Sequence, residues 1–346
     1  MRPTSARAVV VTWNGADMLP PCLDSLLAQV SDVELEVLVV DNASDDGTTE
    51  LLRDRYPQVQ VTRNGSNLGF AGGAAVGCKG YDGDLLLLLN NDATLAPDAL
   101  QRMADALRAP GAQRVAAVTA KILLAGRYLL VPDDGGPLPH GAYRHEGRVA
   151  LPSSSPEAVL LVNSTGNVLS REGSGLDRDW LVTDGQETGG PDVLGFCGGA
   201  AVLRRAALDQ VGGFDPDLFL YYEDTDLSLR LRAAGWTVRY ESGAVAVHRH
   251  AASSGTGSPV FRYYNTRNSL IVLGRHAPLG LVLRSTARQV LGLVAAVVRR
   301  ETPAVRRARC RGLWHATRRL PRTLRERRRT WRGAQVSRRE VGRLLR

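Results

Sequence analysis

Residues 85–92 read LLLLLNND, five leucines followed directly by two asparagines and an aspartate. A short apolar run without polar interruptions is typical of a strand buried on both faces of a sheet, here residues 84–89. Similar runs occur at residues 8–12, 35–40, 59–62 and 115–119, and helical patterns lie between them at residues 19–30, 48–55, 71–79 and 97–107. This alternation predicts an α/β fold whose mostly parallel sheet is flanked by helices.

Polar side chains stand where these strands end. Thr12 and Asn14 follow the first strand, Asp41 ends the second, and residues 90–92 follow the leucines. In such sheets, ligands bind beyond the carboxyl ends of the strands. A carboxylate there, such as Asp92, can hold Mg²⁺ or Mn²⁺, which prefer oxygen ligands and bridge to phosphates. A polar turn is the alternative for residues 90–92, whereas Asp41 would be a costly unpaired carboxylate at the end of a buried strand.

The middle of the chain has a different character. Residues 125–192 are rich in Gly, Pro, Ser and Asp and lack clear periodicity, so we expect a long excursion with a few irregular strands. Long loops inside a compact domain are often functional. Regular patterns then resume, with strands at residues 195–203, 238–240 and 244–247 and helices at residues 205–211, 224–234, 261–273 and 279–298.

Three further stretches could carry chemistry. Residues 223–226 (EDTD) place three acids at the start of a predicted helix, more than an N-cap requires. His248 and His250 follow a predicted strand, where a lone histidine is more often structural than a ligand. Residues 67–73 (NLGFAGG) resemble a phosphate-binding loop only loosely, because the GxGxxG order is missing.

Charge is unevenly distributed along the chain. The formal net charge is 44 − 35 = +9, but residues 299–346 contain 18 Arg and 3 Glu, a net of +15, which leaves −6 for residues 1–298. The basic balance therefore belongs to a tail on a mildly acidic body. A nucleic-acid-binding protein would carry its positive charge on the folded body, so this partner is disfavoured.

Cysteine usage and hydropathy limit the cellular context. The four cysteines form no CxxC pair, which disfavours a zinc site or a disulfide framework and fits a reducing cytosol. The apolar run near the N-terminus is too short for a signal peptide. The most apolar helical stretch, residues 279–298, contains Arg284 and Arg288, which argues against a transmembrane helix.

In their order along the chain, several motifs resemble the family-2 glycosyltransferases with the GT-A fold, and among these the rhamnosyltransferase-like branch. The matching stretches are residues 9–14 (VVVTWN), 39–47 (VVDNASDDG), 67–73 (NLGFAGG), 89–92 (LNND), 195–200 (GFCGGA), 212–215 (GGFD), 222–227 (YEDTDL), and His248 with residues 253–255 (SSG). The resemblance covers about residues 7–275. It implies a GT-A glycosyltransferase domain over residues 1–275 and a helical, Arg-rich extension over residues 276–346.

The resemblance also implies roles for individual residues. Residues 90–92 stand where the family has Asp-x-Asp, with Asn90 in place of the first acid, Asp92 touching Mn²⁺ or Mg²⁺, and His248 as the second protein ligand of the metal. Asp224 would be the general base with Glu223 beside it. Residues that would bind the nucleotide-sugar donor are Thr12, Asn14, Asp41, Asn67, Gly69 and Asn91, and Gly198, Gly199 and residues 125–192 would border the acceptor.

Physical chemistry fits this assignment. A divalent ion neutralises the charge of a departing nucleotide diphosphate, and the acceptor hydroxyl needs a base within hydrogen-bond reach. A carboxylate at a helix N-terminus is expected to stay ionised. One base and one direct attack would invert the anomeric centre. We therefore expect an inverting, metal-dependent enzyme that uses a dTDP- or UDP-sugar, with dTDP-rhamnose as the first choice by resemblance.

The acceptor and the tail leave alternatives open. We expect a saccharide acceptor on a polyprenyl-diphosphate lipid at the cytoplasmic face of the cell membrane, reached through the basic tail. A soluble natural product as acceptor, or a GT-A binding module without turnover, is the alternative. For residues 279–346 the alternatives are a helix packed on the catalytic domain with a solvated or disordered tail, a peripheral membrane anchor, or an arginine-rich segment that binds nucleic acid.

Overall fold

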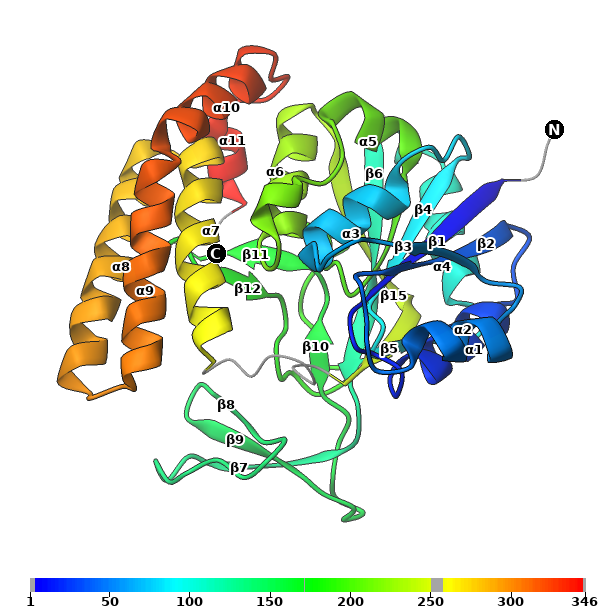
Figure 1. The fold of residues 1–346 in the computed structure, drawn as a ribbon, viewed down its shortest axis with the longest axis horizontal. Helices are drawn as coiled ribbons and strands as arrows, with labels where there is room; N and C mark the ends of the chain where they lie inside the picture. Colours follow the sequence, from blue (N-terminus) through cyan, green and yellow to red (C-terminus); the bar gives the residue numbers. More distant parts are fainter. Residues whose placement is uncertain (1–3, 171, 250–257, 345–346) are drawn as a thin grey trace.

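The computed structural model describes residues 4–170, 172–249 and 258–344, and a ten-stranded mixed sheet forms its centre (Figure 1). The strands are β1 (Ser5–Thr12), β2 (Glu34–Asp41), β3 (Gln60–Arg63), β4 (Leu85–Leu89), β5 (Ala93–Leu95), β6 (Val115–Leu124), β10 (Val162–Ser164), β13 (Asp192–Val193), β14 (Ala200–Arg204) and β15 (Thr237–His248). Strands β4, β1, β2 and β3 are parallel neighbours, as are β6 and β15. Strand β14 lies between β4 and β6 and runs antiparallel to both.

Helices cover both faces of this sheet, which confirms the predicted α/β architecture. They are α1 (Leu19–Leu27), α2 (Thr48–Arg55), α3 (Gly69–Cys78), α4 (Ala99–Arg108), α5 (Arg205–Val211) and α6 (Glu223–Ala233), with short 3₁₀ turns η1 (Ala112–Arg114) and η2 (Pro216–Leu218). Successive side chains of a strand point to opposite faces. Leu87 therefore packs in the core beneath α1, α2 and α4, while Leu88 packs in the core beneath α3, α5 and α6.

One strand replaces two that the sequence predicts. Residues 238–240 and 244–247 are both part of β15, which pairs with β6 along its length. The register shifts between Glu241 and Val245, where extra residues bulge out of the ladder. The polar residues between the two predicted strands form this bulge and do not end the strand. The continuous strand places His248 at the end of the sheet.

The excursion at residues 125–192 supplies small sheets of its own. Strands β7 (Tyr128–Pro132), β8 (Tyr143–His145) and β9 (Arg148–Pro152) form a three-stranded sheet that projects from the body (Figure 1). Strands β11 (Asn167–Leu169) and β12 (Gly175–Asp177) form a hairpin. Between them, β10 pairs with the end of β6 and so joins the excursion to the central sheet.

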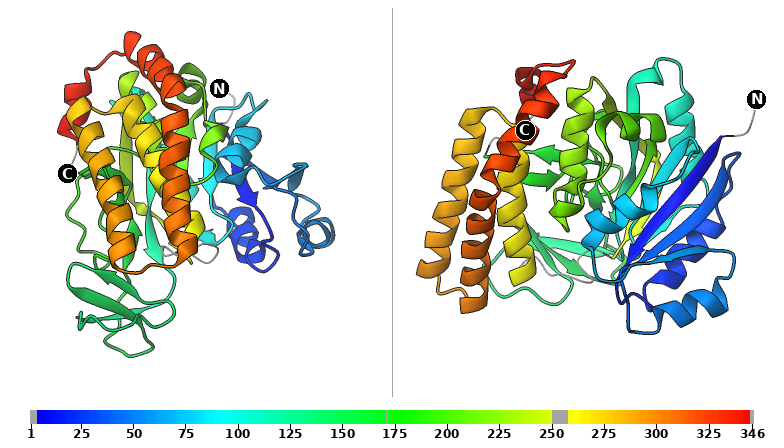
Figure 2. Two further views of the ribbon diagram at one scale, coloured as in Figure 1. Left: turned by 60° about the vertical axis from the view of Figure 1, so that its left-hand side comes forward. Right: turned by 45° about the horizontal axis from the view of Figure 1, so that its top comes forward.

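The C-terminal part is a layer of helices against the α6 side of the body (Figure 2). They are α7 (Pro259–His276), α8 (Leu279–Val298), α9 (Pro303–Arg318), α10 (Leu320–Arg332) and α11 (Arg338–Arg343). A solvated or disordered tail, one of the expected alternatives, is therefore wrong for residues 303–343. Small residues make the packing possible: a Cβ at Gly312 of α9 would lie 2.9 Å from the carbonyl oxygen of Tyr263 in α7.

A buried ion-pair network joins this helical layer to the body. The Arg275 guanidinium at the end of α7 contacts Asp226 of α6 at 3.0 Å, Asp215 at 2.6 Å and Glu326 of α10 at 2.7 Å. His276 adds a 2.9 Å contact to Asp226. The network therefore ties α10 and α7 to the first turns of α6.

We predict that Arg275→Ala lowers the free energy of unfolding by about 3–5 kcal/mol, because it leaves buried carboxylates without their cation. Urea unfolding of the full chain measures this change. Arg325→Ala is the matched control, since Arg325 is an exposed arginine of α10. A loss below about 1 kcal/mol for Arg275→Ala would mean that the network contributes no more than surface ion pairs do.

Candidate active site

The ends of β1 and β4 bring two predicted donor-binding residues into contact. The Asn91 amide donates to the Thr12 hydroxyl over 3.0 Å, and Thr12 is buried. Asn14, with a positive φ of 50°, accepts from the Asp45 backbone amide at 2.9 Å through its side-chain oxygen. Parallel pairing of β1 with β4 explains the meeting, since the carboxyl ends of both strands lie at one edge of the sheet.

Asp41 is buried but not unpaired. One carboxylate oxygen accepts from the Ser44 backbone amide at 2.9 Å and the other lies 2.8 Å from the Arg63 guanidinium. Arg63 is the last residue of β3, and its guanidinium also donates to the Ser44 carbonyl at 2.8 Å. Sequence reasoning missed this arginine; its position at the end of the neighbouring strand was the available signal. The role of Asp41 in donor binding stays a prediction.

Asn67 and Gly69 lie between the edge of the sheet where β1 and β2 end and the segment that precedes α6. The Asn67 side chain accepts from the Gly69 amide at 2.8 Å, and the Asn42 side chain donates to the Gly69 carbonyl at 3.0 Å. Gly69 has φ +68°, and a Cβ there would lie 2.2 Å from the carbonyl oxygen of Phe219. Only glycine fits, so the loop and the segment before α6 are held in contact.

The two predicted metal ligands face each other. Asp92 Oδ1 lies 3.0 Å from His248 Nε2, and the Asn90 amide lies 3.3 Å from the same ring nitrogen. The other ring nitrogen, Nδ1, lies 2.7 Å from the Asn163 side-chain oxygen, which can only accept. Asn163 therefore places a proton on Nδ1, and histidine ligands are commonly oriented by such a partner.

The side chains of Asp92 and His248 fit a divalent cation. His248 Nε2 and Asp92 Oδ1 lie 3.0 Å apart, and an imidazole nitrogen and a carboxylate oxygen are both groups that ligate divalent cations. Among the described residues, no group of three His, Cys, Asp or Glu side chains could hold a metal ion. Asp92 and His248 would thus be two ligands, and donor phosphate oxygens and water would complete the shell.

Asp224 stands at the other side of the site, in the first turn of α6. Its carboxylate accepts from the Gly198 amide at 3.0 Å and from the Thr225 amide at 2.6 Å. Burial raises the pKa of Asp224, although both amides oppose the rise. The pKa rises because desolvation outweighs these hydrogen bonds, and the expectation that Asp224 stays ionised remains a prediction. A raised pKa makes Asp224 a stronger base.

Glu223 is buried beside Asp224. Burial and the neighbouring carboxylate raise the pKa of Glu223 well above its usual range, and its Oε2 atom has no hydrogen-bond partner in the part of the chain that the structure describes. The chain enters α6 through Phe219, Tyr221 and Tyr222, all with φ between 64° and 69°. Non-glycine residues rarely adopt this conformation, and such strain collects at functional sites.

Two glycines connect the metal side to the base side. The Gly199 carbonyl accepts from the backbone amide of Asn90 at 3.1 Å, and a Cβ at Gly199 would lie 3.8 Å from the Asn90 side chain. Gly198 donates to Asp224, and a Cβ there would lie 3.6 Å from its carboxylate. The structure thus brings the predicted acceptor-side glycines between Asn90 and Asp224.

The excursion contributes site residues that sequence reasoning missed. Asp177 of β12 accepts hydrogen bonds from the Ser164 and Cys197 side chains, and burial together with Asp224 raises its pKa to about 6. Ser164 follows Asn163 in β10, so one short strand reaches both His248 and Asp177. No periodicity marks these positions, and no sequence signal identifies them. His250 and residues 253–255 lie outside the described residues.

Comparisons with known proteins identify the family of this chain. Residues 8–129 match the glycosyl transferase family 2 model and residues 158–300 match glycosyl transferase family group 2. An N-acetylglucosaminyl-diphospho-decaprenol L-rhamnosyltransferase of Mycobacterium tuberculosis is 30% identical over 301 residues, 80% of this chain and 89% of the relative. The O-antigen biosynthesis protein RfbC of Myxococcus xanthus is 26% identical over 73% of this chain and 18% of its own length.

Solved structures share the fold. GalNAc-T7 with UDP, GalNAc and Mn²⁺ superposes with a TM-score of 0.55 at 13% identity, over 79% of this chain and 48% of the other. A mannosyltransferase from Pyrobaculum calidifontis with GDP-Man and Mn²⁺ gives 0.52 at 18% identity, over 93% and 88%. The fold and site define a nucleotide-sugar-dependent glycosyltransferase of the GT-A type. The chain belongs to glycosyl transferase family 2, with its similarity in the rhamnosyltransferase-like branch.

We predict that Asp177→Asn stabilises the protein at high pH only. An acid whose pKa is raised to about 6 contributes stability below its ordinary pKa of 3.8, and this is lost as the pH rises through 6. The variant should gain about 1–3 kcal/mol near pH 8 and almost nothing near pH 4. Urea unfolding at both pH values measures this, with the exposed Asp134→Asn as control. An equal gain at both values would contradict the assignment.

Proposed function

We propose that this enzyme transfers a sugar from a dTDP- or UDP-sugar, with dTDP-rhamnose the first donor to test, to a lipid-linked saccharide in cell-envelope polysaccharide synthesis. The observation that carries the proposal is the continuous arrangement from the facing Asp92 and His248, through Asn90 and Gly199, to Asp224. It sets a place for a donor diphosphate beside a place for an acceptor hydroxyl. The relative that acts on a diphospho-decaprenol sugar supports the lipid-linked acceptor.

Asp224 has the features of the general base. Its carboxylate is fixed by two backbone amides, and its raised pKa favours proton uptake from an acceptor hydroxyl. Asp177 and Glu223 lie close to Asp224, and the Asp224 carboxylate contributes to raising the pKa of both. Direct attack of the hydroxyl, opposite the departing diphosphate, inverts the anomeric carbon.

Asp92 and His248 would hold Mn²⁺ or Mg²⁺, which when bound neutralises charge on the donor diphosphate. Asn163 keeps the proton on His248 Nδ1, so that Nε2 stays directed at Asp92. Asn90, in place of an acid, supplies an amide at this point rather than a second carboxylate. We infer that the ion binds mainly together with the donor.

The place of action follows from the acceptor. A polyprenyl-diphosphate lipid stays in the membrane, so the enzyme would work as a peripheral protein at its cytoplasmic face. The net charge of +15 over residues 299–346 favours an anionic lipid surface. A soluble natural-product acceptor is the alternative. The contacts of Asp92, Asp224 and His248 support turnover over a non-catalytic module.

We predict that Asp224→Asn lowers turnover by about 10²–10⁴-fold, because the positioned base is lost. Donor affinity should change little, since Asp224 lies on the acceptor side. Stability should change by no more than about 1–3 kcal/mol, because the amide can accept only one of the two backbone hydrogen bonds that the carboxylate accepts. Steady-state kinetics and nucleotide binding measure these effects. Glu223→Gln is the control, and if it alone abolished turnover, the base would be Glu223.

A panel of nucleotide-sugars tests the donor and the metal together. We predict that the true donor raises the melting temperature with Mn²⁺ and less so in EDTA, because a ligand that binds only the folded state stabilises it. Nucleotide diphosphate release should require Mn²⁺ or Mg²⁺ and increase with a polyprenyl-diphosphate saccharide over the free saccharide. Full transfer in EDTA would exclude the metal role, and equal rates with both acceptors would favour the soluble substrate. The anomeric configuration of the product, read by NMR, tests inversion.

A further inference from the structure

Helix α8 presents a continuous apolar face to the outside. Seven of its large apolar side chains are exposed, by 46–76%: Leu279, Leu283, Val290, Leu291, Val294, Val297 and Val298. At about 100° per residue these fall within an arc of about 120°. The side chains buried against the neighbouring helices, Leu281, Ser285, Gln289 and Ala296, lie on the opposite arc. An apolar stripe of this length on one helix is a mark of an interaction surface.

By length and composition α8 could also cross a membrane, since only 22% of its most apolar stretch is buried in the protein. Its inner face, however, is joined to α7 by polar contacts. The Gln289 amide donates to the Ser269 hydroxyl at 3.0 Å and its oxygen accepts from the Thr266 hydroxyl at 3.3 Å. A spanning α8 would have to break these contacts and place Arg284 and Arg288 in hydrocarbon.

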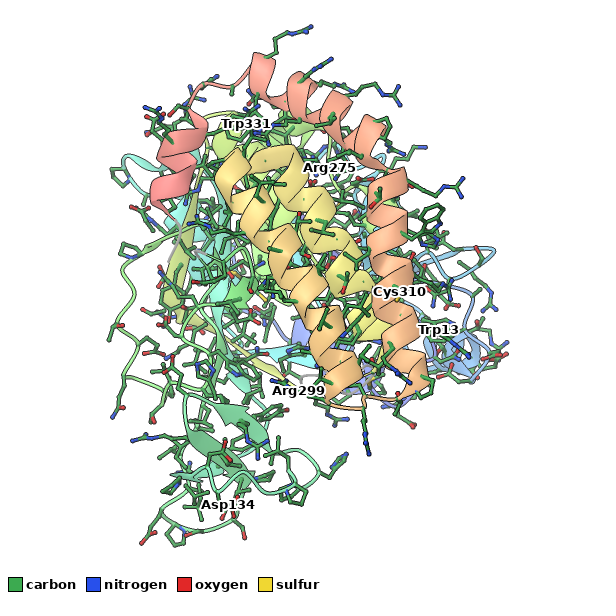
Figure 3. All side chains as sticks on the ribbon, turned by 90° about the vertical axis from the view of Figure 1, so that its left-hand side faces the viewer. Trp13, Asp134, Arg275, Arg299, Cys310 and Trp331 are labelled. Carbon is green, nitrogen blue, oxygen red and sulfur yellow. The ribbon has the colours of Figure 1, made fainter. Side chains whose placement is uncertain are left out.

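Positive charge lies at one edge of the stripe and beyond its C-terminal end. Arg284 lies at its edge, and exposed Arg299 and Arg300 follow its last residues, where α8 turns into α9 (Figure 3). Behind them comes the helical segment 303–343, part of a stretch with a net charge of +15. A second copy docked on α8 would bring two such basic layers together, which like-charge repulsion disfavours. Anionic headgroups complement the same layer.

We propose that the outward face of α8 lies in the headgroup region of an anionic bilayer and that its apolar side chains, rather than the arginines alone, hold the enzyme there. The helix stays parallel to the surface because its inner face remains packed on α7 and α9. This inference rests on the proposed lipid-linked acceptor, which requires an enzyme that stays at the membrane. It replaces a mobile charged tail with a folded docking face.

Vesicle co-sedimentation of the full chain tests the proposal without donor or acceptor. We expect binding to phosphatidylglycerol-containing vesicles that weakens with salt but persists near 1 M, where the Debye length is about 3 Å. The triple variant Leu283→Gln, Leu291→Gln, Val294→Gln should lose at least about tenfold of this salt-resistant binding. The matched control, Leu27→Gln, Val30→Gln, Val61→Gln, changes similarly exposed apolar residues elsewhere and should bind as wild type.

Several outcomes would overturn the proposal. These are equal binding of the α8 variant and wild type, no vesicle binding by wild type at low salt, or resistance of the bound protein to alkaline carbonate extraction, which indicates a spanning helix. A dimer in analytical ultracentrifugation that only the α8 variant dissociates would assign the face to a second copy. Nucleotide diphosphate release from the donor should be unchanged in the α8 variant and reports separately on the proposed function.

Discussion

One buried carboxylate, Asp226, sets the position of α6, the helix that carries the proposed base. Burial alone would raise its pKa, but Arg230, His276 and Arg275 hold that pKa well below its usual range. Two residues earlier on the same helix, Asp224 has no such cation among the described residues, and burial raises its pKa. The two environments give the acids different roles. Asp226, paired with cations, fixes α6 against α7, whereas Asp224 is left able to take up a proton.

The candidate active site depends on contributions from both halves of the chain. The parallel strands β1 and β4 end at Thr12 and Asn91, while β15 delivers His248 and α6 delivers Asp224. The small strand β10 links the two halves, since Asn163 orients His248 and its neighbour Ser164 reaches Asp177. A stretch without helical or strand periodicity thus completes the site, and its carboxylate is kept there at a cost in stability near neutral pH.

The charge asymmetry of the chain acquires a structural meaning through the C-terminal helices. Most of the arginines that give residues 299–346 their charge lie on α9, α10 and α11. Some also make internal contacts: Arg327 donates to the carbonyls of Gly274 and Ala277 at the end of α7. Helix ends leave such carbonyls without partners, so these arginines stabilise the layer as well as charging it. The apolar face of α8 is then held outward by a rigid support.

Local pattern was enough to predict the strands, most of the helices and the residues at the strand ends, because a short apolar run followed by polar residues has few other solutions in an α/β sheet. Motif order was enough to predict the family, whereas the roles of Asp92, Asp224 and His248 remain predictions. Tertiary structure alone decided the reversed strand β14, the roles of Asn163 and Asp177, the folded state of the basic tail and the raised pKa of Asp224. These features depend on burial and on partners distant in sequence, which no local pattern contains.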